Sequence, residues 1–306
     1  MSVTSKTRVP QEIWKSIFSF CRKEQLRECL FVCRNWYMLA KPVFYEEVMI
    51  PNESTSALFT VTLATFHNGV YVHHLALPQK QKPRRRKASP LYSSLIIQYM
   101  FQSCPNLLSV DLDICNPYYF LRSLVKIELD KLQQIKIQWS SIRRFGSPAV
   151  KRYFLIANQL HRKSILSLEI PDIPDSVWTG DNTLSKQDYM SQFLRLEHLT
   201  INQSTHVFIS FSKILSSLPK LKTLHYISLF RSLGITDQDI LDSSKVKYVN
   251  LKSLSLEVFH LSVNDIEYII NSLPSLRMMD TSLRYAEKFK DYISESNALI
   301  VLVGSP

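Results

Sequence analysis

Apolar residues recur along most of the chain at one fixed spacing. An apolar residue is followed by two positions of any type, a second apolar residue, one further position and a third apolar residue, as in Leu107, Val110 and Leu112. The frame begins at residues 45, 72, 107, 132, 165, 196, 221, 251 and 276, a mean period of about 29 residues. Because alternating apolar positions are typical of a strand with one buried face, the frame predicts nine short strands.

Helix signals lie between the predicted strands. Residues 103–107, 217–221 and 272–276 each carry a proline two positions before a strand, where proline ends a preceding helix. Helix-start signals are Ser147-Pro148, Ser185-x-x-Asp188, Thr236-x-x-Asp239 and Ser262-x-x-Asp265. Such strand and helix units cannot cover their own apolar faces, so they are expected to stack into a curved solenoid with the strands on the concave side. A plain α/β domain with a parallel sheet is the alternative.

The first fifty residues follow a different, helical spacing. Pro10 suits a first helical turn, and Ile13, Ile17 and Phe20 then recur at helical spacing. A second apolar stripe runs through Leu26, Cys29, Leu30, Cys33, Trp36 and Ala40 and ends at Pro42. The pattern predicts two or three short helices. So small a bundle is marginally stable alone and usually needs a neighbour to cover it.

Composition excludes several classes of protein. The chain has 306 residues of which 45% are hydrophobic, so it can bury a core. No apolar run reaches the roughly 18 residues of a membrane span, and no signal peptide is evident, so we expect an intracellular protein of the cytoplasm, the nucleus or both. Five cysteines without a Cys-x-x-Cys pair favour free thiols, with Cys29 and Cys33 packed in the core of one helix. We expect no cofactor and no metal.

The positive charge is concentrated in one segment. The formal net charge is +11, and residues 80–87 (KQKPRRRK) hold a large share of the excess cations. We expect a basic loop at residues 79–89. It is interpreted as a solvated insertion, a nuclear-import signal or a contact for an acidic target through Arg84, Arg85 and Arg86.

Side chains between the framework positions are expected on the concave face, because strand side chains alternate. The cations of this face are Lys136, Lys222, Lys252 and Arg277, and the anions are Asp111, Glu169, Glu197 and Asp280. Their charges cancel, which disfavours nucleic-acid binding on the strands. His198 and His225 lie in adjacent repeats without metal-ligand spacing, so they are expected to face solvent or a partner. The predicted target-binding residues are His198, His225, Lys222, Lys252 and Arg277 on this face, together with Arg84, Arg85 and Arg86 of the basic loop.

Residues 9–40 resemble a known family. Pro10, Glu12, Ile13, Ile17, Phe18, Leu26, Cys29, Val32, Cys33, Arg34 and Trp36 match the F-box pattern, and Val9 stands where leucine is usual. The resemblance implies a docking surface for a Skp-type adaptor and, through it, a cullin. The implied adaptor-binding residues are Val9, Pro10, Ile13, Ile17, Phe18, Leu26, Val32 and Trp36. Trp36 either joins this interface or pins the helices to the following domain.

The repeats resemble the leucine-rich-repeat class of F-box proteins, although the family's Asn or Cys after the strand appears only as Cys115. The expected α/β chain has a flexible N-terminus (1–7), a helical F-box (8–44) and an irregular solenoid (45–304). The resemblance implies a non-catalytic substrate-recognition subunit of an SCF ubiquitin ligase that binds an unknown target protein. The alternative is a stand-alone repeat scaffold that binds an acidic protein or nucleic acid. No Ser-His-Asp arrangement or Gly-x-Ser-x-Gly motif that would indicate an enzyme is visible.

Overall fold

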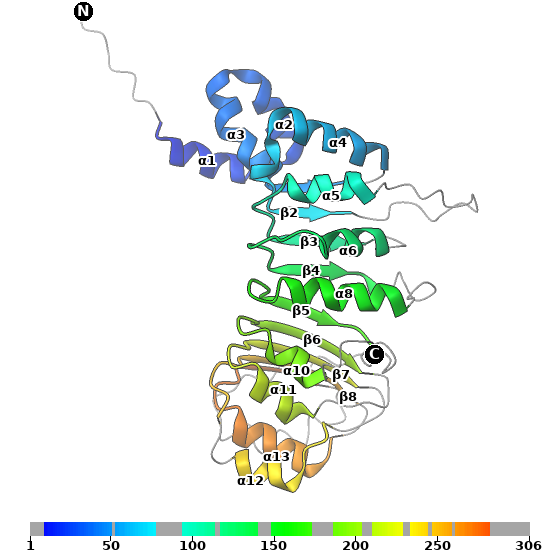
Figure 1. The fold of residues 1–306 in the computed structure, drawn as a ribbon. Helices are drawn as coiled ribbons and strands as arrows, with labels where there is room; N and C mark the ends of the chain where they lie inside the picture. The colour runs from blue at the N-terminus through cyan, green and yellow to red at the C-terminus, as the bar shows by residue number, and fades with distance from the viewer. Residues whose placement is uncertain are drawn as a thin grey trace, which may run out of the picture.

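The computed structural model describes residues 9–50, 53–77, 94–113, 117–139, 148–172, 186–203, 210–228, 233–243, 247–258 and 261–281 (Figure 1). The predicted flexible N-terminus, the predicted basic loop at 79–89 and Cys115 lie outside the described residues. None of the helices in the described ranges is long and apolar enough to cross a membrane.

Three helices open the chain: α1 (Gln11–Ser19), α2 (Lys23–Val32) and α3 (Arg34–Glu46). The second predicted stripe is divided because Cys33 has an extended backbone and separates α2 from α3. Cys33 is consequently exposed, which corrects its expected place in a helix core. The third helix also continues past Pro42, because Val43 and Phe44 beyond it pack against the helical core.

The described residues that follow form a nine-stranded, all-parallel sheet with its strands in sequence order (Figure 1). The strands are β1 (Glu47–Met49), β2 (His74–Ala76), β3 (Ser109–Leu112), β4 (Gln134–Ile137), β5 (Ser167–Ile170), β6 (His198–Gln203), β7 (Thr223–Ser228), β8 (Ser253–Val258) and β9 (Met278–Thr281). Each strand pairs only with its chain neighbours, so the sheet grows by one strand per repeat.

Helical segments connect the strands. They are α4 (Glu53–Phe66), the short 3-10 helix η1 (Asn68–Tyr71), α5 (Ser94–Gln102), α6 (Tyr118–Leu124), α8 (Pro148–Leu160), α10 (Lys186–Ser191), α11 (Phe211–Ser217), α12 (Asp237–Ser243) and α13 (Val263–Ser272). In Figure 1, α5, α6 and α8 lie on the same face of the sheet. Helices pack about 8–10 Å apart, whereas paired strands are about 4.8 Å apart, so this stacking favours a concave strand side.

The repeating apolar frame is confirmed as the buried core in seven of the nine repeats, whereas Tyr45 and Val48 of the first repeat and Leu276 of the last are half-buried. Leu107, Val110 and Leu112 are fully buried, and the equivalent positions of the repeats beginning at residues 72, 132, 165, 196, 221 and 251 are at most 5% exposed. Pairing is in register, with Leu199 opposite Leu224 and Leu224 opposite Leu254. The frame residues therefore form continuous apolar rows through the sheet, which is what makes stacking of the repeats obligatory.

Two of the predicted helix-start signals are capping boxes in the structure. The Ser262 hydroxyl accepts from the Asp265 N–H at 3.1 Å, and the Asp265 carboxylate accepts from the Ser262 N–H at 2.8 Å. Thr236 and Asp239 form the same reciprocal pair at the start of α12. Each box satisfies donors that a helix N-terminus leaves without partners, which is why these helices begin where the sequence predicts.

Candidate functional site

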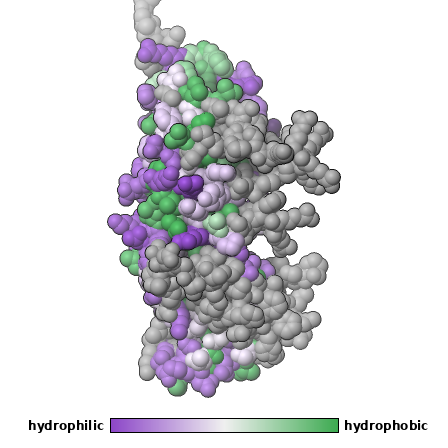
Figure 2. All heavy atoms as spheres, turned by 45° about the vertical axis from the view of Figure 1, so that its right-hand side comes forward, coloured by the Kyte–Doolittle hydropathy of each residue, from purple (hydrophilic) through white to green (hydrophobic). Residues whose placement is uncertain are grey.

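The first candidate surface is a set of apolar side chains on the N-terminal helices. Val9, Ile13, Ile17 and Val32 are 45%, 51%, 44% and 60% exposed, and Pro10 is exposed as well. Ile13 and Ile17 lie one turn apart on α1. Figure 2 shows apolar and hydrophilic residues mixed at this end of the molecule. Exposed apolar side chains gathered on one short helical unit are typical of a protein interface.

Two of the predicted adaptor-binding residues lie in the core of the N-terminal helices and not on this surface. Phe18 and Leu26 are 1% and 2% exposed and form the core of the three helices with Leu39 and Ala40. Their side chains pack beneath the exposed residues and are too buried to contact a partner. The physical reason is that α1 carries two adjacent apolar stripes, and the stripe of Trp14 and Phe18 is the one that faces α3.

Trp36 is an internal packing residue. Its ring lies 5.1 Å from Trp14 and 5.5 Å from Phe18, in tilted and edge-on arrangements. Trp14 was not among the predicted site residues, although its spacing of four from Phe18 was a usable signal. Trp36 is half-buried and packs against the core of the N-terminal helices, and its role in an adaptor interface stays a prediction.

Further apolar side chains are exposed on the same helices. Phe20 and Phe31 are 88% and 80% exposed, and Met38 is 57% exposed. The sequence did not predict Phe31 and Met38 as exposed, because their exposure depends on where α2 ends and on which face of α3 packs against it. They enlarge the apolar surface presented by the N-terminal helices.

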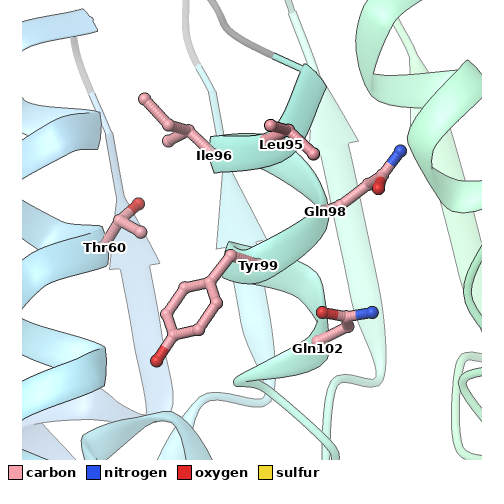
Figure 3. A pocket seen from close by; sticks show the side chains of 6 residues that line it. All are labelled: Thr60, Leu95, Ile96, Gln98, Tyr99 and Gln102. Atoms are coloured by element: carbon pink, nitrogen blue, oxygen red, sulfur yellow. The ribbon is translucent and has the colours of Figure 1, made fainter.

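A shallow hollow of about 410 Å³ lies between α4 and α5. Figure 3 shows Thr60 of α4 across from Ile96 and Tyr99 of α5. Leu95 lines the hollow and is 74% exposed, while Leu58 and Phe66 of α4 are also exposed. This hollow is lined by apolar and neutral polar side chains.

The second candidate surface is the open face of the sheet, opposite the buried frame. Across β2 to β5 its polar side chains bind one another. His74 Nδ1 lies 2.7 Å from Ser109 Oγ, and Gln134 donates to Ser167 Oγ at 3.0 Å. These contacts connect neighbouring strands at equivalent register positions.

Charges on the same part of the face also compensate one another. Lys136 Nζ lies 3.9 Å from Asp111 Oδ2. Partial burial raises the pKa of Asp111, and Lys136 acts against that rise. Burial likewise raises the pKa of Glu169, again opposed by Lys136. One lysine thus lies against two carboxylates, and its positive charge is compensated within this half of the face.

Across β6 to β9 the face is arranged differently. One row of residues, here called the edge row, contains Glu197, Lys222, Lys252 and Arg277. Each of its residues after Glu197 donates its backbone N–H to the backbone carbonyl of the preceding residue in the row, at 2.8–2.9 Å. Lys222 Nζ binds Glu197 at 2.7 Å. Lys252 and Arg277 are exposed and form no ion pair with any side chain that the structure describes.

The predicted histidines lie on this part of the face. His198 is exposed, and His225 Nε2 lies 3.0 Å from Glu257 Oε1 on β8. Arg84, Arg85 and Arg86 fall outside the described residues, so the structure does not bring them to the face. The structure thus gathers five of the eight predicted target-binding residues, His198, His225, Lys222, Lys252 and Arg277, on neighbouring strands.

Metal or nucleophilic chemistry has little support among the described residues. They contain no group of three or more His, Cys, Asp or Glu placed to hold a metal ion. Burial raises the pKa of the Cys104 thiol to about 12, which keeps it protonated and unreactive. The described surfaces are suited to binding.

No protein-family model matches the chain, and no curated protein matches it.

Proposed function

We propose that the chain is the substrate-recognition subunit of an SCF-type ubiquitin ligase. The observation that carries the proposal is the exposed apolar stripe of Ile13 and Ile17, which lies within the segment whose residues resemble an F-box. Three short helices that leave such side chains in water are expected to gain stability and solubility from a partner. The proposed partner is a Skp-type adaptor, and through it a cullin.

The solenoid is proposed to hold the target protein. Its open face presents hydroxyl, amide, imidazole and charged groups on an array fixed by the parallel backbone pairing. A rigid array of this kind binds a protein surface with little loss of side-chain freedom. The contribution to ubiquitination is effective concentration, because other subunits make the bond. We therefore propose a non-catalytic role, carried out inside the cell.

Substitution of the exposed stripe tests the adaptor surface. Ile13→Asp with Ile17→Asp should weaken binding of a recombinant Skp-type adaptor by at least about tenfold, because two carboxylates would be desolvated without partners. Isothermal titration calorimetry measures the affinity. Both side chains are about half exposed, so the helices are expected to stay folded.

A matched variant serves as the control for this experiment. Lys15→Asp with Ser16→Asp also places two carboxylates on α1, at exposed positions outside the apolar stripe. It should bind the adaptor within about threefold of the unsubstituted chain. If the Ile13 and Ile17 variant also stays within that range, the adaptor assignment is wrong, and a stand-alone scaffold becomes the better account of the fold.

A further inference from the structure

The open face of the sheet divides into two electrostatic halves. Across β3 to β5, Lys136 is placed against Asp111 and Glu169, so its charge is used within the face. Across β7 to β9, the edge row carries three consecutive cations, and the carboxylate of Glu197 neutralises Lys222 at one end. Lys252 and Arg277 remain exposed, without an ion pair to any side chain described by the structure.

Backbone pairing sets the spacing of these two cations. The Arg277 N–H donates to the Lys252 carbonyl at 2.9 Å, so the two residues lie at equivalent positions on neighbouring chain segments, about 4.8 Å apart. The next positions on the face are occupied by short polar side chains, Thr223 and Ser253, which pair in register and are half-buried. A surface of short, hydroxyl-bearing side chains therefore lies beside the cations of the edge row.

We propose that this part of the open face, the edge row with the hydroxyl row beside it, binds an extended acidic segment of the target protein. The assignment of that partner as a ligase target rests on the proposed function. Lys252 and Arg277 bind its carboxylates. The Thr223 and Ser253 hydroxyls donate to or accept from its backbone. Charge complementarity is the basis for this occupant, because these two cations have no ion-pair partner among the described side chains, whereas Lys136 and Lys222 of the same face each have one.

The neighbouring carboxylates select a protein segment over a nucleic acid. Glu197 lies at the end of the edge row, where the Lys222 hydrogen bond lowers its pKa and keeps it ionised. Glu257 of β8 is on the far side of the hydroxyl row. A continuous phosphate backbone would meet these negative charges, whereas a peptide with a few acidic residues meets only the cations.

Fluorescence anisotropy with a defined probe tests the proposal. The probe is a short fluorescein-labelled peptide of alternating glutamate and serine, titrated with the full chain. Lys252→Glu with Arg277→Glu should weaken its binding by at least about tenfold, because two attractive contacts become repulsive. Binding by the unsubstituted chain should also weaken as the salt concentration rises from about 0.05 to 0.3 M.

The control changes the net charge equally at other positions. Lys126→Glu with Lys163→Glu alters two exposed lysines, one after α6 and one after α8. This variant should bind the peptide within about twofold of the unsubstituted chain, since it leaves the edge row intact. Thermal unfolding of both variants should match the unsubstituted chain, because all four positions are exposed.

Four results would overturn the proposal. They are an undetectable peptide affinity at low salt, an equal loss of affinity in the two double variants, a loss of affinity only when Arg84, Arg85 and Arg86 become alanine, and tighter binding of a single-stranded oligonucleotide than of the peptide through Lys252 and Arg277. Adaptor affinity is measured on the same samples. If the adaptor fails to bind while the edge row binds the peptide, the ligase function is wrong and the acidic-segment site stands.

Discussion

At the scale of single residues, buried polar groups differ in whether they have partners. The Tyr226 hydroxyl is buried and has no hydrogen-bond partner among the described residues, while its ring packs edge-on against Phe211 at 5.9 Å. The Tyr189 hydroxyl, in contrast, donates to the Leu155 carbonyl at 3.0 Å. Both side chains are almost fully buried, so they form a matched pair.

Phenylalanine substitutions should separate the two tyrosines. Tyr226→Phe keeps the ring and removes an unpaired hydroxyl, so the free energy of unfolding should stay the same or rise by up to about 1 kcal/mol. Tyr189→Phe removes a buried hydrogen bond, so the free energy of unfolding should fall by about 1 kcal/mol. Urea unfolding measures both. A clear loss for Tyr226→Phe would show that its hydroxyl has a buried partner such as water.

His161, which follows α8, links stability to pH. Its side chain is 3% exposed, and burial lowers its pKa below the ordinary value of 6.5. Hydrogen bonds to the backbone of Leu124 and Leu129 act against the shift. The carboxylates of Glu128 and Asp130 also oppose it without reversing its direction. The ring is therefore neutral in the folded chain at pH values where the unfolded chain already binds a proton.

The sign of the pH effect follows from this difference. As the pH falls through about 6.5, His161 binds a proton in the unfolded chain but not in the folded chain. The contribution of His161 to stability is therefore present above that pH and lost below it. His161→Gln should reduce the fall in urea-unfolding free energy between about pH 7.5 and 5.5. The slopes with pH are compared, because the substitution also changes packing. Equal slopes would mean that another group titrates.

At the scale of elements, the strands alternate buried positions with positions on the open face. On β8 and just before it, Leu254 is fully buried while Lys252 is exposed. Leu254→Ala should lower the unfolding free energy by about 2–5 kcal/mol, because it opens a cavity in an apolar row. Lys252→Ala should change it by less than about 0.5 kcal/mol. Equal losses in a denaturant titration would mean that the repeat frame is wrong.

The helices show which features a sequence pattern can predict and which it cannot. The Ser262 and Asp265 signal predicts the start of α13, because the capping chemistry is local. In α1, two apolar stripes run side by side, and only contact with α3 decides that Trp14 and Phe18 turn inward while Ile17 stays exposed. The helix α4 was not predicted at all, since its apolar residues follow no single face.

At the scale of the whole molecule, the fold was predictable because its pattern repeats. One strand with three apolar positions is weak evidence, but nine in the same frame predict a parallel stack, and the structure has nine parallel strands in sequence order. The binding surfaces were harder to predict. The position of Lys252 beside Arg277 follows from the frame, whereas their lack of described ion-pair partners depends on how Glu197 and Lys222 pair.

Strictly sequential pairing from β1 to β9 also makes the molecule a spacer of fixed length. Seven strand-to-strand steps separate β1, which follows the N-terminal helices, from β8, which carries the cationic edge. At about 4.8 Å a step, they span about 34 Å. In the proposed complex, an adaptor on the helices and an acidic segment on the edge row would be held that far apart. Each added or deleted repeat would change the reach from the adaptor to the bound segment by one step.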